Sequence, residues 1–314
     1  MKTKQEASFR GRLLRQFSIF NKGSLGEVYS LCKETFRGFI NDNSLSHGAA
    51  IAFYTVTSMA PLLLVVTAVA GIAFGDAAAR GAIVTQLSGL TGQGSASFFQ
   101  GMIESASTKS SSAIATIIGT VTLLITISGV FGEMQSALNA IWKVKTADTS
   151  VSRLVRARAV SFGLVVALGF LLMTSLALSA ALAAFGDYMK AVWPSSTFLL
   201  EILNFISSLL LITVLFGALY KVLPDRNLEW KDVTIGAISS AILFSAGKYL
   251  IAAYLASSGI ATTYGAAGAL ILLLLWVYYS VQIFLLGAEF TKAYAQRYGS
   301  RKNKTALRPK TVEL

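Results

Sequence analysis

The stretch Ala269-Leu-Ile-Leu-Leu-Leu-Leu-Trp276 decides the fold, because it runs through two helical turns without a charged side chain or a polar face. A helix at the surface of a soluble protein needs such a face. The whole chain has the same bias: 54% of its 314 residues are hydrophobic and 13% are charged, against roughly 25% charged in a typical soluble domain. This composition argues against a soluble enzyme and predicts a membrane protein.

Long apolar runs identify the segments that cross the membrane, since a helix needs about 20 apolar residues to span a hydrocarbon core of ~30 Å. Within these runs Glu201, Lys248 and Glu289 are the formally charged residues. We therefore predict an all-α polytopic membrane protein with six transmembrane helices. The predicted spans are 47–74, 112–132, 159–185, 198–220, 233–256 and 266–290.

Lysine and arginine gather on one side of this topology. The N-terminal segment, the 133–158 and 221–232 loops and the C-terminal tail together carry 23 of the 27. The alternate loops hold only Arg80, Lys109 and Lys190. Because cytoplasmic flanks carry the excess of positive charge, we expect both termini to be cytoplasmic.

The topology divides the chain into three parts. They are a basic cytoplasmic segment at 1–46, a six-span membrane domain at 47–290 and a basic cytoplasmic tail at 291–314. The first span follows a long basic segment and is longer than the apolar core of a signal peptide, which has about 7–15 residues. We therefore expect the N-terminus to be retained.

Two further stretches are predicted to be helical without spanning. In 25–40, apolar residues recur at helical spacing beside Lys33, Glu34 and Arg37, which is typical of an amphipathic helix in the cytoplasmic interface or of a short helix packed on the loops. The outer loop 75–111 breaks at Thr91-Gly-Gln-Gly94 between two apolar stretches. This pattern of two apolar stretches with a break between them favours an outer helical hairpin over a long solvated loop.

Several short motifs occur in a characteristic order along the chain. They are Ala49-Ala-Ile-Ala-Phe-Tyr54, Ser58-Met-Ala-Pro-Leu62, Glu133 with Leu138-Asn-Ala-Ile-Trp142, Leu223-Pro224, Tyr264-Gly-Ala266, Trp276, Tyr278 and Gly287-Ala-Glu289. With this spacing the chain resembles the YihY/BrkB family of bacterial inner-membrane proteins over about residues 25–295. The resemblance implies a multi-pass protein of the bacterial inner (plasma) membrane. It also implies one of three roles: a virulence or serum-resistance factor, a transporter, or the tRNA-processing enzyme historically called ribonuclease BN.

The residues themselves disfavour the ribonuclease. Phosphodiester hydrolysis needs metal ions held by clustered carboxylates and histidines, or an acid–base pair. The chain has one histidine and one cysteine, and its Asp225, Glu229 and Asp232 lie among basic residues, which is typical of a solvated, charge-balanced loop. We expect no catalytic residues, no metal and no cofactor.

Nucleic acid is not an expected partner either. The basic tail Ser300-Arg-Lys-Asn-Lys304 contains no aromatic side chain that could stack on a base. Attraction to anionic membrane lipids explains its charge. Membrane lipids are therefore the expected partners, with an anionic lipid as a possible substrate.

Lys248 lies about two-thirds of the way across the fifth span, where an ammonium costs up to ~2.5–3.5 kcal/mol on insertion scales. Glu201, near the outer end of the fourth span, is the acidic residue closest to it in depth. Three interpretations stay open: a structural ion pair with Glu201, snorkelling toward the interface, or contact with an anionic substrate or ion.

His47, Glu133 and Glu289 are predicted to gather at the cytoplasmic ends of the first, second and sixth spans. They could form a proton relay, because histidine titrates near neutral pH, or they could cap and anchor the helices. Pro61 is predicted to kink the first span, because it cannot donate to the carbonyl of Thr57.

Three functions follow from these observations. The first is a transporter of an amphipathic anionic lipid or envelope precursor, favoured by the single lysine inside the membrane and the lack of an acidic residue near mid-depth. The second is a cation/proton antiporter, which would normally place a carboxylate near the midplane. The third is a non-transporting scaffold that recruits partners through its basic cytoplasmic face.

Overall fold

The computed structural model describes residues 25–75, 113–144, 197–258 and 266–301, together with residue 163 and isolated positions between 77 and 104. Its described part is helical and contains no strand, which confirms the predicted all-α class. The predicted third span and most of the predicted outer hairpin lie outside it. The helices are α2 (Leu25–Asn41), α3 (Ser44–Phe74), α6 (Ala113–Ile141), α8 (Thr197–Val222), α9 (Trp230–Ser257) and α11 (Ala266–Arg297).

Four helices of the described part are long and apolar enough to cross a membrane. The qualifying segments are Val121–Ile141 in α6, Phe205–Val222 in α8, Trp230–Tyr254 in α9 and Ala267–Arg297 in α11. α3 adds 31 residues, which at 1.5 Å per residue extend over about 46 Å. These helices confirm a membrane-spanning protein, while the count of six spans stays a prediction.

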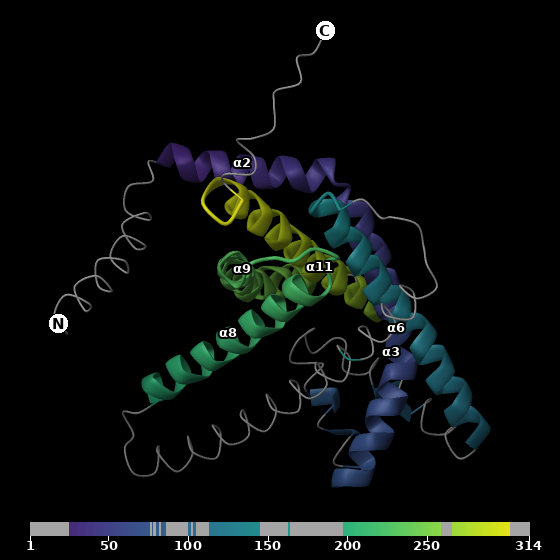
Figure 1. Cartoon of the computed structure of the whole chain (residues 1–314). Helices are drawn as coiled ribbons and strands as arrows, with labels where there is room; N and C mark the ends of the chain where they lie inside the picture. Colours follow the sequence, from purple (N-terminus) through teal and green to yellow (C-terminus); the bar gives the residue numbers. More distant parts are fainter. Residues whose placement is uncertain are drawn as a thin grey trace, which may run out of the picture.

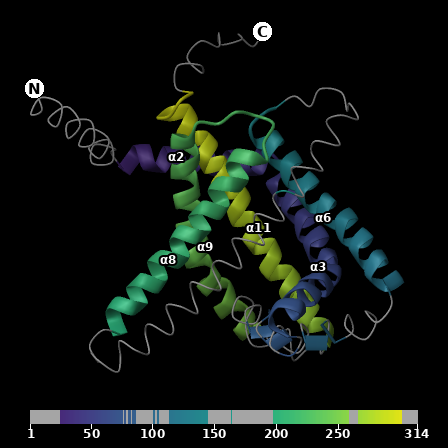
Figure 2. The same cartoon turned by 60° about the horizontal axis from the view of Figure 1, so that its bottom comes forward.

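The described helices are arranged with their basic flanks at one end of the molecule. α2 lies across this end, where α3 and α9 begin and α6, α8 and α11 finish (Figures 1 and 2). We call this end of the molecule the basic end, because Lys143, Arg226, Lys231 and Lys292 lie there. α6 finishes at the basic end, whereas α8 begins at the opposite end. The chain therefore has to cross between the two ends after α6 and before α8, where the third span is predicted.

Two helices continue beyond the spans that hydropathy predicts. α6 runs past residue 132 to Ile141, and α11 runs past residue 290 to Arg297. The extension of α6 is amphipathic: Ala137, Leu138 and Ile141 are buried whereas Ser136 is exposed. Hydropathy detects where apolar side chains stop, and an amphipathic helix continues beyond that point. Glu133 and Glu289 therefore lie inside helices rather than at helix ends.

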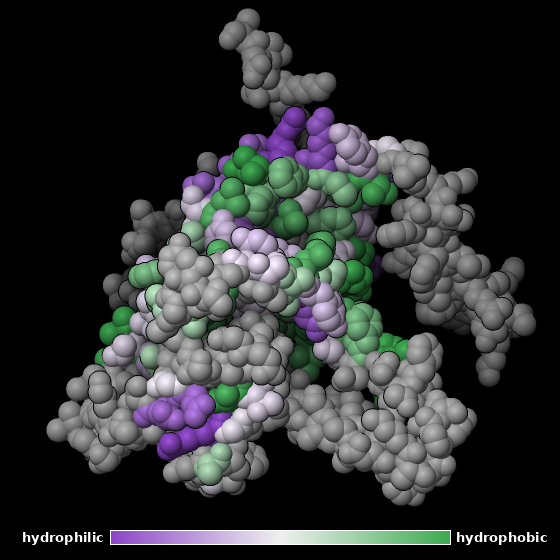
Figure 3. Space-filling view, turned by 180° about the vertical axis from the view of Figure 1, so that it is seen from behind, coloured by the Kyte–Doolittle hydropathy of each residue, from purple (hydrophilic) through white to green (hydrophobic). Residues whose placement is uncertain are grey.

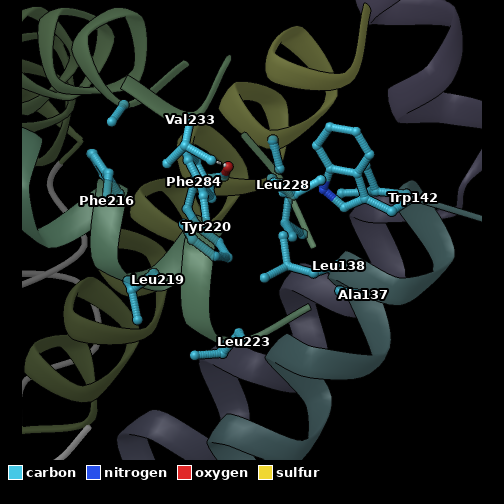
Figure 4. Packing of buried hydrophobic residues seen from close by; sticks show 14 of the residues in the cluster. Ala137, Leu138, Trp142, Phe216, Leu219, Tyr220, Leu223, Leu228, Val233 and Phe284 are labelled. Atoms are coloured by element: carbon cyan, nitrogen blue, oxygen red, sulfur yellow. Dashed lines mark hydrogen bonds between the residues drawn. The ribbon is translucent and has the colours of Figure 1, made fainter. Parts of the chain in front are cut away.

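The largest cluster of buried residues joins α6, α8, α9 and α11 toward the basic end (Figure 4). At its centre Tyr220 stacks on Phe216 and Phe284, with ring centroids 6.0 and 5.2 Å apart. Its hydroxyl donates to the carbonyl of Phe284 at 2.7 Å and lies 2.9 Å from Ser240 Oγ. The buried phenol therefore has its polar atom satisfied, as burial requires.

Away from this cluster the helices expose apolar side chains. Ile125 of α6, Leu210 of α8 and Leu250 of α9 are each more than 60% exposed. Figure 3 shows hydrophilic residues along its top edge, the end at which α2 lies in Figure 1, with mainly hydrophobic residues directly below them and a second hydrophilic group near the bottom. So much exposed apolar surface matches a protein that lies in lipid.

Candidate functional site

Lys248 lies on the face of α9 that packs against α8. Successive helical residues turn by about 100°, so Ala237, Ala241 and Lys248 fall within about 40° of one another around the helix axis. Ala237 and Ala241 are buried, and a Cβ placed on Gly217 of α8 would lie 3.7 Å from the Cβ of Ala237. Lys248 therefore continues the stripe that meets α8, and its side chain is half-buried.

Helices α8 and α9 diverge at the level of Lys248. The contact between Gly217 of α8 and Ala237 of α9 gives a reference level for this antiparallel pair. Ile206 lies about three turns from Gly217 on the same face of α8, and Lys248 lies about three turns from Ala237 in the same direction. Ile206 and Lys248 are therefore level with each other. Ile206 is nevertheless 54% exposed. Figures 1 and 2 show α8 diverging from α9 in this direction. An ammonium and an exposed apolar helix face thus lie at the same level on two helices that diverge.

Lys248 forms no ion pair with the carboxylates whose side chains the structure describes. Its Nζ lies 5.0 Å from the ring centroid of the neighbouring Tyr249. Glu201 occupies the second turn of α8, about 8 Å further from the basic end than Ile206, and its side chain lies outside the described part of the chain. The predicted Lys248–Glu201 pair therefore stays a prediction.

His47 and Glu133 are brought together at the basic end. His47 Nδ1 lies 2.6 Å from Glu133 Oε1, and each side chain is about three-quarters buried. Glu289, the third residue predicted for this group, contacts Lys292 and Asp42 instead. The described contacts thus place the three residues in two clusters, which does not support a single relay through all three.

The second cluster contains residues that sequence reasoning missed. Lys292 Nζ lies 2.9 Å from Asp42 Oδ2 and 2.9 Å from Glu289 Oε2, while Lys143 binds Asp42 Oδ1. The side chains of Asp42 and Glu289 are each 2% exposed, that of Lys292 is 14% exposed and that of Lys143 is 67% exposed. We call these four residues the basic-end cluster. Only the spacing of Glu289 and Lys292, three positions apart on one helix, is a signal that the sequence carries.

The corner between α2 and α3 positions Asp42. Asn43 adopts a left-handed conformation with φ of 57°, which asparagine tolerates better than most residues, and it turns the chain from α2 into α3 directly after Asp42. Burial alone would raise the pKa of Asp42. Hydrogen bonds with Lys143, Glu289 and Lys292 outweigh that effect and hold the pKa below its ordinary value.

Two of the three acidic residues around the start of α9, Asp225 and Asp232, have hydrogen-bond partners far away in the sequence. Asp225 accepts hydrogen bonds from Gln135 at 3.0 Å and from Asn139 at 2.9 Å, and its backbone N–H donates to the Asn139 side chain. Asp232 is buried and accepts from Ser300 Oγ at 2.6 Å. The expectation of a solvated loop is wrong for Asp232, which is buried in the first turn of α9. Asp225 is exposed, as expected, although it is bonded to α6.

Pro61 lies inside α3, which continues through it as one helix. The hydroxyls of Thr57 and Ser58 donate to carbonyls of the preceding turn, those of Phe53, Tyr54 and Thr55. The carbonyl of Thr57, which Pro61 leaves without a backbone donor, accepts no hydrogen bond from these two hydroxyls. The described part of the chain holds no group of three His, Cys, Asp or Glu side chains that could bind a metal ion.

Comparison with known proteins identifies a family. The sequence model of the family described as virulence factor BrkB matches residues 35–311. The match covers α3, α6, α8, α9 and α11 in full, together with the basic-end cluster, His47 and Lys248. No solved structure matches the chain.

The similar curated proteins are bacterial membrane proteins. A UPF0761 membrane protein of Janthinobacterium sp. (strain Marseille) is 33% identical over 56% of this chain and 39% of its own length. One of Rhodospirillum centenum is 26% identical over 86% of this chain and 58% of its own length. The UPF0761 membrane protein YihY of Escherichia coli O7:K1 is 32% identical over 56% of this chain and 58% of its own length. The chain thus matches 39% to 58% of the length of these relatives.

Proposed function

Since the chain belongs to the virulence factor BrkB family, we propose that it is a transporter in the bacterial inner membrane. Its substrate is an amphipathic anion, either a lipid or an envelope precursor. The basic end faces the cytoplasm, because positive flanks are retained on that side. Virulence-related activity would then follow from the envelope components that it moves.

One observation carries the proposal: Lys248 lies level with an exposed apolar face of α8 where the two helices separate. An ammonium inside the membrane needs compensation, and the carboxylates with described side chains do not provide it. An anionic headgroup would supply the missing charge. Its acyl chain would cover Ile202 and Ile206, which are exposed on the same face of α8.

Lipid translocation in proteoliposomes tests the proposal. A dye-labelled phosphatidylglycerol serves as the anionic probe and a dye-labelled phosphatidylcholine as the neutral one. We expect faster translocation of the anionic probe and a loss of about ten- to a hundredfold in Lys248→Ala, as expected for one charged hydrogen bond worth ~1.5–3 kcal/mol. Lys248→Arg should keep most of the activity.

Leu243→Ala is the matched control. Leu243 is exposed on the same helix but lies about 140° away from Lys248 around its axis, so its truncation should leave translocation unchanged. Equal losses in both α9 variants would refute the assigned role of Lys248. Cation flux without lipid movement would favour the antiporter, and one stoichiometric partner without any flux would favour the scaffold.

A further inference from the structure

The basic-end cluster is the densest group of buried charges in the described part of the chain, and the transport proposal does not use it. It joins the α2–α3 corner, the end of α6 and the last third of α11. Its buried members are two carboxyls, Asp42 and Glu289, which share a single buried ammonium, that of Lys292. Lys143 is the fourth member and is mostly exposed to solvent.

The charges of the buried members do not balance when both carboxyls are ionised. Two negative charges then share one buried positive charge, and the further cation that the described contacts give, Lys143, pairs with Asp42 from the solvent-exposed rim. An unbalanced buried charge is costly, and neighbouring carboxylates commonly avoid it by sharing a proton. One proton would make the buried members neutral.

Glu289 has a free atom for that proton. Its Oε1 is buried and has no hydrogen-bond partner among the described residues, whereas its Oε2 is engaged by Lys292. A proton can therefore be added to the Glu289 carboxyl without displacing an existing hydrogen bond.

We propose that Asp42 and Glu289 together bind one exchangeable proton, and that its release loosens the docking of the α2–α3 corner on α11. Proton binding stands independently of transport. Its use as the energy source or trigger of transport rests on the proposed function.

The groups that face this pair come from each element around it. Lys292 belongs to α11, Lys143 follows α6, and Asp42 itself follows α2. On α3 the nearest titratable group is His47, which is engaged by Glu133 of α6. The acidic Asp232 of α9 is bonded to Ser300. Within the described contacts, Lys292 is thus the one buried cation available to both carboxyls.

Gly38 links the charge of Glu289 to the position of α2. A Cβ placed on Gly38 would lie 2.4 Å from Glu289 Oε2, so the backbone of α2 rests directly on this carboxylate. A side chain at position 38 would hold the two helices apart. A change in charge at Glu289 therefore acts on α2 at contact distance.

Infrared difference spectroscopy of the full chain in lipid nanodiscs tests proton binding. Wild-type protein should show the carbonyl stretch of a protonated carboxyl at a pH where exposed carboxyls are ionised, and the band should disappear on alkalinisation. Glu289→Gln should abolish it, and Asp42→Asn should shift its midpoint. Glu34→Gln, which removes an exposed carboxyl of α2, should leave it unchanged. Absence of the band in the wild type, or its persistence in Glu289→Gln, would overturn the proposal.

The single cysteine provides a second measurement that does not depend on how well the variants fold. Cys32 is exposed on α2, so a fluorophore attached there reports on the docking of this helix. In wild-type protein its emission should change with the same midpoint as the infrared band. A pH-independent emission alongside a titrating band would refute the coupling to α2. Proton binding without lipid translocation would leave this inference intact while refuting the proposed transport.

Discussion

At the scale of single residues, Asp42 shows how distant partners determine the behaviour of one carboxyl. It is nearly inaccessible to solvent and binds both Lys143 and Lys292, which lie far away in the sequence. Its local sequence, Asn41-Asp42-Asn43-Ser44, predicts only a polar turn. Nothing near it in the chain indicates that two lysines will converge on it.

The lowered pKa of Asp42 predicts acid sensitivity. Burial raises this pKa, but the hydrogen bonds from the lysines lower it more, so the folded protein binds this proton less readily than the unfolded chain. The stabilisation is therefore complete above the ordinary pKa of about 4 and is lost as the pH falls through the folded pKa. Unfolding in detergent, measured against pH, should show stability falling below about pH 4.

Asp42→Asn tests the assignment. It should remove part of that acid dependence and lower stability at neutral pH, because Lys292 then loses one of its two partners. Glu34→Gln, at an exposed position on α2, serves as the control and should retain the full dependence. An identical pH slope in Asp42→Asn and wild type would contradict the role of Asp42.

At the scale of elements, α9 and α11 approach each other through glycines. A Cβ on Gly287 would lie 1.8 Å from Ser240 Oγ and 2.5 Å from Tyr220 OH, and one on Gly236 would lie 1.8 Å from Thr291 Oγ1. Hydropathy registers these positions only as mildly apolar. Small residues at a membrane helix interface allow the backbones to approach closely, which accounts for Gly287 in the motif Gly287-Ala-Glu289.

Gly287→Ala should therefore destabilise the protein by about 1–3 kcal/mol, the usual cost of overpacking. Gly132→Ala in α6 is the matched control, since a Cβ there meets nothing within 4 Å and alanine favours helix. Unfolding midpoints in a denaturant series measure both variants. Equal effects would show that the α9–α11 contact tolerates an added methyl group.

α2 presents three distinct faces. Leu31, Thr35 and Phe39 are buried toward the bundle, whereas Tyr29, Phe36 and Ile40 form an exposed apolar stripe beside a polar one that includes Lys33 and Arg37. A helix with one face on the protein, one apolar and one charged is suited to the membrane interface. The predicted helix over 25–40 is present, and its interfacial position is the interpretation that these faces favour.

Cys32 makes this interpretation testable, because it lies within the exposed apolar stripe. A fluorophore on Cys32 should be quenched by brominated lipids. The same fluorophore on Glu34→Cys, prepared with Cys32→Ser, should be quenched much less, since position 34 lies about 160° away around the helix. Equal quenching at both positions would show that α2 does not lie in the interface.

At the scale of the whole molecule, the basic flanks predict one orientation. α9 carries a suitable pair of exposed positions, Lys231 at its basic end and Ser257 at its opposite end. In a Cys32→Ser background, Ser257→Cys should react with a membrane-impermeant thiol reagent in cells with a permeabilised outer membrane. Lys231→Cys should react only after lysis. The reverse pattern would invert the topology and the direction of the proposed transport.

The sequence by itself determined the class of this protein. Long apolar runs, an amphipathic segment and the family motifs are local properties, and a bilayer acts on each run almost independently of its neighbours. For this reason the all-helical membrane fold, α2 and the family follow from the chain alone. The ends of α6 and α11 do not, because amphipathic extensions depend on the helices that cover them.

Only the tertiary structure decided which polar groups meet. His47 contacts Glu133, whereas Glu289 contacts Lys292, which also binds Asp42. Lys248 lies level with the exposed face of α8. These relations depend on helix register and, for Glu289, on the close approach of α2 that Gly38 allows. Register follows from packing summed over whole helices, so no short pattern in the sequence encodes it.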